Sequence, residues 1–259
     1  MSRRAWLYAS VAALSVAISA LAFAPAAWLG QFLEMQSKRK LTLIDADGSL
    51  WRGSALLGAA SLSDGTVTPL LPGRFAWQLS PWLLLIGRID LQLANPESLS
   101  KPVHLSGSLR QWHLDAGSVL LPAERLAALG APLNTLTPSG RMRLAWNDLN
   151  ADAHDGALQL HGVVTLELDD MGSRLSPVNP LGSYRMRMTW QGTQAPLTLT
   201  SLHGPLLLQG NGTIHDGKLQ FSGSAEAASG QEEKLANLLN LLGQRRQQDG
   251  RNIIALEFK

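Results

Sequence analysis

The chain of 259 residues contains no cysteine. This excludes disulfide bonds, thiolate metal sites and cysteine nucleophiles, but it does not exclude an oxidising compartment, because a large enough core is stable without disulfides. Charged residues make up only 16% of the chain and hydrophobic residues 45%, which argues against disorder. The length suffices for one sizeable core or two small ones.

The sequence also lacks the short motifs of common enzymes. No serine has glycine at both −2 and +2, and neither a phosphate-binding loop nor a zincin helix motif occurs. Gly210-Asn211-Gly212 has no third glycine and no following helix, so it predicts a turn. The nearest approach to a ligand cluster, Asp152, His154 and Asp155, stands in a polar stretch that reads as a solvated loop. We therefore expect no catalytic residue, no metal and no cofactor.

An apolar stretch occupies the N-terminal region, where the 29 residues between Arg4 and Glu34 include no Asp, Glu, Lys, Arg or His. Residues 5–24 are long enough to cross the roughly 30 Å hydrocarbon core as a helix. Arg3 and Arg4 precede the stretch, which predicts a cytoplasmic N-terminus and export of the rest. The predicted single-pass inner-membrane anchor comprises Ala5, Trp6, Leu7, Val11, Leu14, Val16, Ile18, Leu21, Phe23 and Trp28.

A cleaved signal peptide is the competing interpretation, because Ala22-Phe23-Ala24 offers a small-residue cleavage site. Pro25 directly after it is unfavourable for cleavage, and the apolar stretch exceeds the usual length of a signal-peptide core. We expect residues 1–40 to form a cytoplasmic stub, the transmembrane anchor and a linker, or a cleaved leader on the competing interpretation. On both interpretations residues 41–259 form a periplasmic β-rich domain.

The charge of the exported part differs from that of the whole chain. Five of the 22 basic residues and one of the 20 acidic residues precede Leu41, which leaves 17 basic and 19 acidic residues beyond it. No clustered basic footprint of a nucleic-acid binder is present there, so nucleic acid is not an expected partner. Residues 37–40 (SKRK) either meet anionic lipid head groups or form a polar linker.

From Leu41 onward apolar and polar residues alternate, as in residues 184–190 (YRMRMTW), which is typical of half-buried strands. Turn formers separate these runs, and Asp216-Gly217 is the clearest two-residue hairpin signal. Helical spacing appears in residues 122–130 and 231–248. Residues 81–86 (PWLLLI) are too short and too apolar for their periodicity to distinguish a helix from a strand. The pattern predicts a mainly β fold: an N-terminal transmembrane helix, then an open, curved antiparallel meander covered at one end by a C-terminal amphipathic helix.

Residues 48–55 (GSLWRGSA) follow the anchor closely, with Trp51 and Arg52 between two glycines. Glycine within a strand pattern indicates a bulge or a close backbone approach, and we expect Trp51 to anchor the first strand in the core. This segment resembles the signature of the type II secretion system protein N family. The resemblance continues in residues 75–93, 139–146, 204–212 and 235–250, and so extends over nearly the whole chain.

The resemblance implies a single-pass inner-membrane component of the machinery that exports folded proteins, and it supplies no catalytic residues. The candidate signature or interaction residues are Gly48, Trp51, Arg52, Gly53, Trp77, Pro81, Arg185 and Arg187. The expected partners are other subunits of the secretion assembly, including the outer-membrane channel, and membrane lipid. A periplasmic lipid-binding or lipid-transfer module with an apolar groove is the alternative, and a periplasmic enzyme is a third one.

Overall fold

The computed structural model describes residues 8, 12, 15–16, 19–37, 41–60, 67–108, 110–129, 137–154, 157–242, 244–248 and 251–258. Of the predicted anchor residues, Ala5, Trp6, Leu7, Val11, Leu14 and Ile18 lie outside this set. Within it, none of the helices combines the length and the apolar character that a membrane crossing requires. Residues 19–22 are helical, but Trp28 lies on a separate helix, α2 (Ala27–Gln36), because Pro25 bridges to Ser49 and interrupts the helical path.

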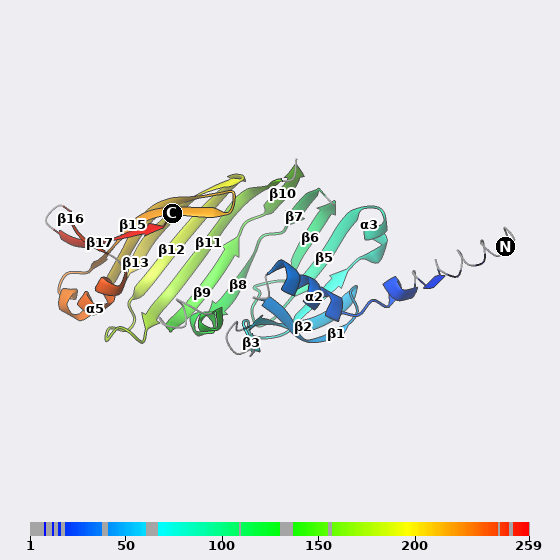
Figure 1. Cartoon of the computed structure of the whole chain (residues 1–259), viewed down its shortest axis with the longest axis horizontal. Helices are drawn as coiled ribbons and strands as arrows, with labels where there is room; N and C mark the ends of the chain where they lie inside the picture. Colours follow the sequence, from blue (N-terminus) through cyan, green and yellow to red (C-terminus); the bar gives the residue numbers. More distant parts are fainter. Residues whose placement is uncertain are drawn as a thin grey trace.

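The described chain forms one antiparallel sheet of 17 strands, which confirms the predicted mainly β, open antiparallel architecture (Figure 1). Most neighbours in the sheet are consecutive in sequence, as in a meander. The strands are β1 (Leu41–Gly48), β2 (Arg52–Ala60), β3 (Val67–Pro69), β4 (Phe75–Leu79), β5 (Arg88–Ala94), β6 (Val103–Ser108), β7 (Gln111–Leu114), β8 (Gly117–Pro122), β9 (Pro138–Trp146), β10 (Leu149–His154), β11 (Ala157–Ser173), β12 (Gly182–Gly192), β13 (Gln194–His203), β14 (Leu206–His215), β15 (Lys218–Ala227), β16 (Gln244–Gln248) and β17 (Arg251–Phe258).

The central strand β11 is long enough to hold two shorter strands on one side. Its first part pairs with β10 and its second part with β9, while β12 pairs along its other side. On the far side of these two short strands, β7 pairs with β10 and β8 pairs with β9. The meander therefore stays continuous through its middle although the chain bends between these short strands.

The helical segments differ from the expected ones in length. α5 (Glu232–Leu242) ends before the predicted limit of residue 248, because residues 244–248 form β16, which pairs with β17. The predicted helix over 122–130 is the 3₁₀ helix η1 (Ala123–Leu129), and the unassigned residues 81–86 contain α3 (Pro81–Leu85). Pairing with a neighbouring strand thus overrides helical spacing in residues 244–248.

The prediction of a turn at Gly210-Asn211-Gly212 is wrong, because these residues lie inside β14. The turn falls at Asp216-Gly217, as predicted, where both residues have positive φ (49° and 75°). Gly210 is instead a packing position: a Cβ there would stand 2.4 Å from the Phe221 ring. Glycine in this strand makes room for an aromatic side chain of β15.

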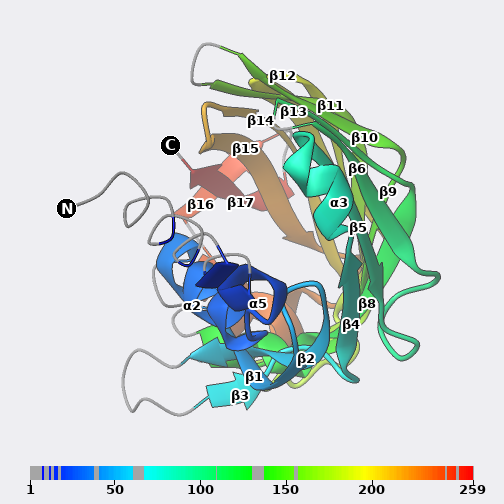
Figure 2. The same ribbon diagram turned by 90° about the vertical axis from the view of Figure 1, so that its right-hand side faces the viewer.

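The sheet is strongly curved, and Figure 2 shows α2 and α5 on its concave side. We call this concave surface the apolar face. α2 packs on Ala55 and Trp77 at one end, and α5 packs on Ala225 and Ile254 at the other. Direct cross-strand pairs join the two ends on the same face: Trp77–Leu93–Val103, Leu79–Leu91–Leu105–Leu114–Leu149, Trp146–Val164–Met188–Leu197 and Leu144–Leu166–Met186–Leu199.

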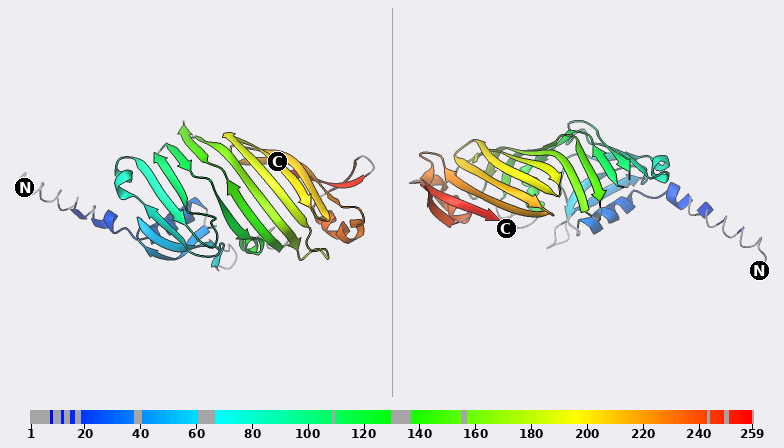
Figure 3. Two further views of the ribbon diagram at one scale, coloured as in Figure 1. Left: turned by 180° about the vertical axis from the view of Figure 1, so that it is seen from behind. Right: turned by 90° about the horizontal axis from the view of Figure 1, so that it is seen from above.

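Between its two ends the apolar face has little cover from helices. η1 contacts β2, β8 and β9, and Leu105, Leu114, Leu166 and Met188 are half-buried, not fully buried. The two views of Figure 3 show the sheet as an elongated, single-layered body with α3 near one end and α5 at the other. The fold therefore presents an apolar surface larger than its own helices cover.

Candidate functional site

The signature segment forms the hairpin between β1 and β2. Gly48 faces Gly53 across it, and Gly48 has φ of 87°. A Cβ on Gly53 would stand 2.5 Å from both the Asp47 carbonyl oxygen and the Trp77 ring. Both glycines are therefore required by the backbone geometry of this turn, as the sequence indicated.

The hairpin binds the N-terminal segment to the sheet, and we call this contact the N-terminal junction. The Trp51 indole Nε1 donates to the Leu21 carbonyl (2.9 Å), and the Leu50 amide donates to the Ala24 carbonyl (2.8 Å). In return, the Ala26 amide donates to the Gly48 carbonyl (3.2 Å). The predicted core position of Trp51 is wrong, because Trp51 lies half-buried in the turn, where its indole holds the N-terminal segment.

Trp77 of β4 is the buried tryptophan of the junction, with 6% of its surface exposed. Its indole Nε1 is shared between the carbonyls of Leu50 (3.1 Å) and Ser49 (3.3 Å). Both carbonyls belong to the turn between β1 and β2, so the indole N–H stabilises the turn while the ring packs against Ala26 and Ala55.

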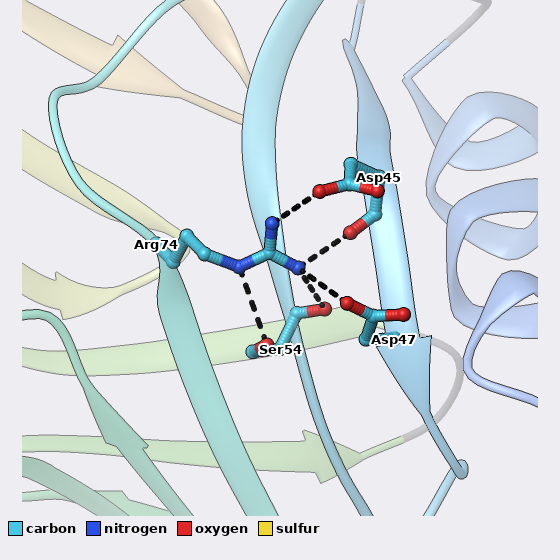
Figure 4. Close-up of polar contacts among 4 residues, drawn as sticks. All are labelled: Asp45, Asp47, Ser54 and Arg74. Carbon is cyan, nitrogen blue, oxygen red and sulfur yellow. Dashed lines mark hydrogen bonds and ion pairs between the residues drawn. The ribbon is translucent and has the colours of Figure 1, made fainter.

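Arg74, which sequence reasoning missed, ties β1, β2 and the start of β4 together (Figure 4). Its guanidinium donates to the Asp45 carboxylate, the Asp45 carbonyl (2.6 Å) and the Asp47 carboxylate (3.3 Å). It also donates to the Ser54 carbonyl at 3.4 Å. Asp45 has φ of 52°, where β1 bulges out of register, so the arginine stabilises an irregular stretch of strand. No sequence pattern predicts that Arg74 contacts Asp45, because only the pairing of β1, β2 and β4 in the sheet brings the two residues together.

An apolar cavity of about 370 Å³ lies between α2 and the sheet. Leu29, Phe32 and Leu33 of α2 close it on one side, and Phe75, Trp77 and Leu91 belong to its sheet side. Its volume lies within the range of small-molecule sites, about 300–1,000 Å³. Its walls could hold a hydrocarbon chain, because they offer such a ligand dispersion contacts and almost no polar atoms.

Arg185 and Arg187 lie elsewhere, on the convex side of β12, opposite the apolar face. We call this exposed surface the polar face. Arg185 and Arg143 of β9 both bond to Glu167 of β11, at 3.1 and 3.0 Å. Arg187 pairs in register with Thr165 and Thr198 and, among the described residues, has no ion-pair partner. The predicted alternation of β12 is thus confirmed, with arginines on one face and Tyr184 and the methionines on the other.

One serine–histidine pair comes within hydrogen-bond distance, a contact that the sequence did not reveal. Ser183 Oγ lies 3.1 Å from His203 Nε2, but Ser183 is 1% exposed and its oxygen accepts the Asp170 amide proton. A substrate carbonyl has no access to such an oxygen, so the pair acts as a tie between β11, β12 and β13. Burial also raises the pKa of the neighbouring Tyr184 phenol, which donates to the Leu206 carbonyl (3.0 Å).

The predicted site residues thus separate into two groups. Gly48, Trp51, Gly53 and Trp77 meet at the N-terminal junction, and Arg52 is exposed beside them. Pro81 begins α3 two residues beyond Leu79, whose amide bonds to the Trp51 carbonyl (2.7 Å). Arg185 and Arg187 are remote from this cluster. The predicted loop is wrong for Asp152 and His154, which lie in β10, where they pair with β11; Asp155 is outside the described residues. No metal-ligating group of three side chains occurs in the part that the structure describes.

Comparison with known proteins decides the family. The sequence model of the type II secretion system protein N family matches residues 39–254. The chain belongs to the type II secretion system protein N family. Membership assigns the chain to type II secretion, associates it with the cell envelope and implies contacts with other components of that system. Neither the curated proteins nor the solved structures contain a match to the chain.

Proposed function

We propose that this protein is a non-enzymatic component of the secretion machinery, held at the inner membrane by the apolar segment before α2, with residues 41–259 in the periplasm. In this proposal residues 1–40 are the cytoplasmic stub, anchor and linker. The N-terminal junction then transmits the position of the anchor to the sheet, since Leu21 and Ala24 are bonded to the hairpin by their carbonyls.

The observation that carries this proposal is the two-faced, single-layered sheet with an open edge. In the described part, β16 is hydrogen-bonded along one side only, to β17, so its other side can accept a strand from a partner. The polar face adds an exposed cation, Arg187, which has no ion-pair partner among the described residues and suits a partner carboxylate. Other secretion subunits, including the outer-membrane channel, are the partners we propose for these surfaces.

Photocrosslinking in secreting cells tests the proposal. A photoreactive residue is placed at Arg187 on the polar face and at Arg246 on β16, and Met188, next in sequence but on the apolar face, is the matched control. We expect protein adducts at the first two positions and not at Met188. If neither Arg187 nor Arg246 yields an adduct with a secretion protein, these surfaces are not the contacts.

A second candidate, a lipid-binding module, is favoured by the cavity beneath α2 and the half-buried middle of the apolar face. Its test is a cavity-filling variant. Leu91→Trp should lower the lipid that copurifies with the protein, measured by mass spectrometry of an organic extract, whereas Leu219→Trp on the exposed β14–β15 hairpin should not. Equal lipid content in both variants and the wild type would exclude this cavity as the lipid site.

A further inference from the structure

The segment around α3 exposes an unusual amount of apolar surface. Trp82 is 77% exposed, Leu85 70% and Ile86 69%; the first two lie in α3, and Ile86 is its C-cap residue. Single exposed apolar residues are common on soluble proteins, but a contiguous group with a tryptophan indicates a contact surface. We call these three residues the α3 tip.

Hydrogen bonds connect the N-terminal segment to the end of β4, just before α3. The Leu21 carbonyl accepts the Trp51 indole proton (2.9 Å), and the Trp51 carbonyl accepts the Leu79 amide proton (2.7 Å). Leu79 is the last residue of β4, and α3 begins at Pro81. Figures 1 and 3 agree that α3 and the described residues before α2 lie at the same end of the sheet, away from α5.

Basic side chains flank the α3 tip. Arg88 is exposed at the start of β5, two residues after Ile86, and its register partner is Ser108 at the end of β6. Arg110 is exposed in the turn that follows Ser108, and its amide bonds to the Ser108 hydroxyl (3.2 Å). An aromatic and aliphatic tip beside two cations has the composition of segments that enter the head-group region of anionic bilayers.

We propose that the α3 tip inserts into the interface of the membrane that holds the N-terminal segment. This inference rests on the proposed anchor, because the bilayer is the partner within reach of α3 at that end. With contacts at both the anchor and the α3 tip, the sheet cannot pivot freely about the linker. Its long axis then points away from the bilayer and carries α5 into the periplasm.

Spin labelling of the full chain in vesicles of phosphatidylethanolamine and phosphatidylglycerol tests the contact. The protein contains no cysteine, so Leu85→Cys, Val16→Cys and Leu241→Cys each give one labelling site. Leu241, on α5 and 69% exposed, matches Leu85 in residue type and exposure but lies at the opposite end. The collision rates of each label with oxygen, which dissolves in lipid, and with a water-soluble nickel chelate are measured.

The three sites separate the possible results. We expect the ratio of the oxygen collision rate to the nickel collision rate to be several-fold higher at Leu85→Cys than at Leu241→Cys. At Val16→Cys we expect the high ratio of a label within the bilayer. If Val16→Cys is in lipid but Leu85→Cys matches Leu241→Cys, the anchor stands and the α3 contact is overturned. If Val16→Cys is also aqueous, the proposed anchor itself fails. Arg88→Gln in the Leu85→Cys background should lower the ratio at Leu85, because a cation facing anionic lipid is lost.

Discussion

Replacement of Trp77 tests whether the N-terminal junction is a structural support of the sheet. The ring is 6% exposed, packs among Ala26 and Ala55, and satisfies the carbonyls of Ser49 and Leu50. Truncation of a buried tryptophan to alanine costs about 3–5 kcal/mol. Since whole domains are stable by only about 5–15 kcal/mol, Trp77→Ala should remove a large part of the free energy of unfolding.

Trp77→Phe separates packing from hydrogen bonding. The phenyl ring keeps much of the buried volume but lacks the indole N–H, so the two turn carbonyls lose their donor, at a cost of about 1–3 kcal/mol. The carbonyls lie on the hairpin that holds Leu21 and Ala24, and we therefore expect faster proteolysis in the segment before α2 for both variants.

Urea unfolding of the full-length protein in mild detergent, followed by far-ultraviolet circular dichroism, measures these effects without relying on tryptophan fluorescence. Trp82→Ala is the control, because Trp82 is 77% exposed and should change the midpoint little. The order of midpoints should be wild type and Trp82→Ala highest, then Trp77→Phe, then Trp77→Ala. A Trp77→Ala midpoint equal to that of Trp82→Ala would refute the structural role of the junction.

Three further outcomes follow from single contacts. Gly210→Ala should destabilise the protein by about 1–3 kcal/mol in a thermal melt, because its Cβ would meet the Phe221 ring at 2.4 Å; an unchanged melt would contradict this packing. Arg74→Ala should cost about 1 kcal/mol at low salt and less at high salt, since its carboxylate partners are exposed; urea titrations at two salt concentrations measure the difference. Tyr184→Phe should cost about 0.5–1.5 kcal/mol at neutral pH by removing the bond to Leu206. Burial raises the pKa of Tyr184 in the folded state above its value of 10.0 in the unfolded state. The phenol therefore contributes its full stabilisation below pH 10, and this contribution falls as the pH rises further. The difference in the free energy of unfolding between the wild type and Tyr184→Phe should shrink between about pH 10 and 12.

Much of the local structure could be predicted from the sequence. Alternation in residues 184–190 specifies which side chains of β12 share a face, because successive strand residues point to opposite sides. Asp216-Gly217 marks its hairpin because both residues adopt positive φ readily. The same local rules fail at Gly210-Asn211-Gly212, where the ring of Phe221 on the next strand requires a glycine, and at residues 244–248, where β17 provides a pairing partner.

The sequence by itself determined the strand period, the hairpin at Asp216-Gly217, the importance of Gly48 and Gly53 and the family, since each depends on residues close together in the chain. Only the tertiary structure decided that Trp51 bonds to Leu21, that Arg74 bridges two aspartates and that α3 lies at the same end of the sheet as the N-terminal segment. The two hydrogen-bonded contacts join residues 27 to 30 positions apart, and no local pattern encodes which strands become neighbours. The curvature that leaves one apolar face partly open likewise arises from the register of the whole sheet.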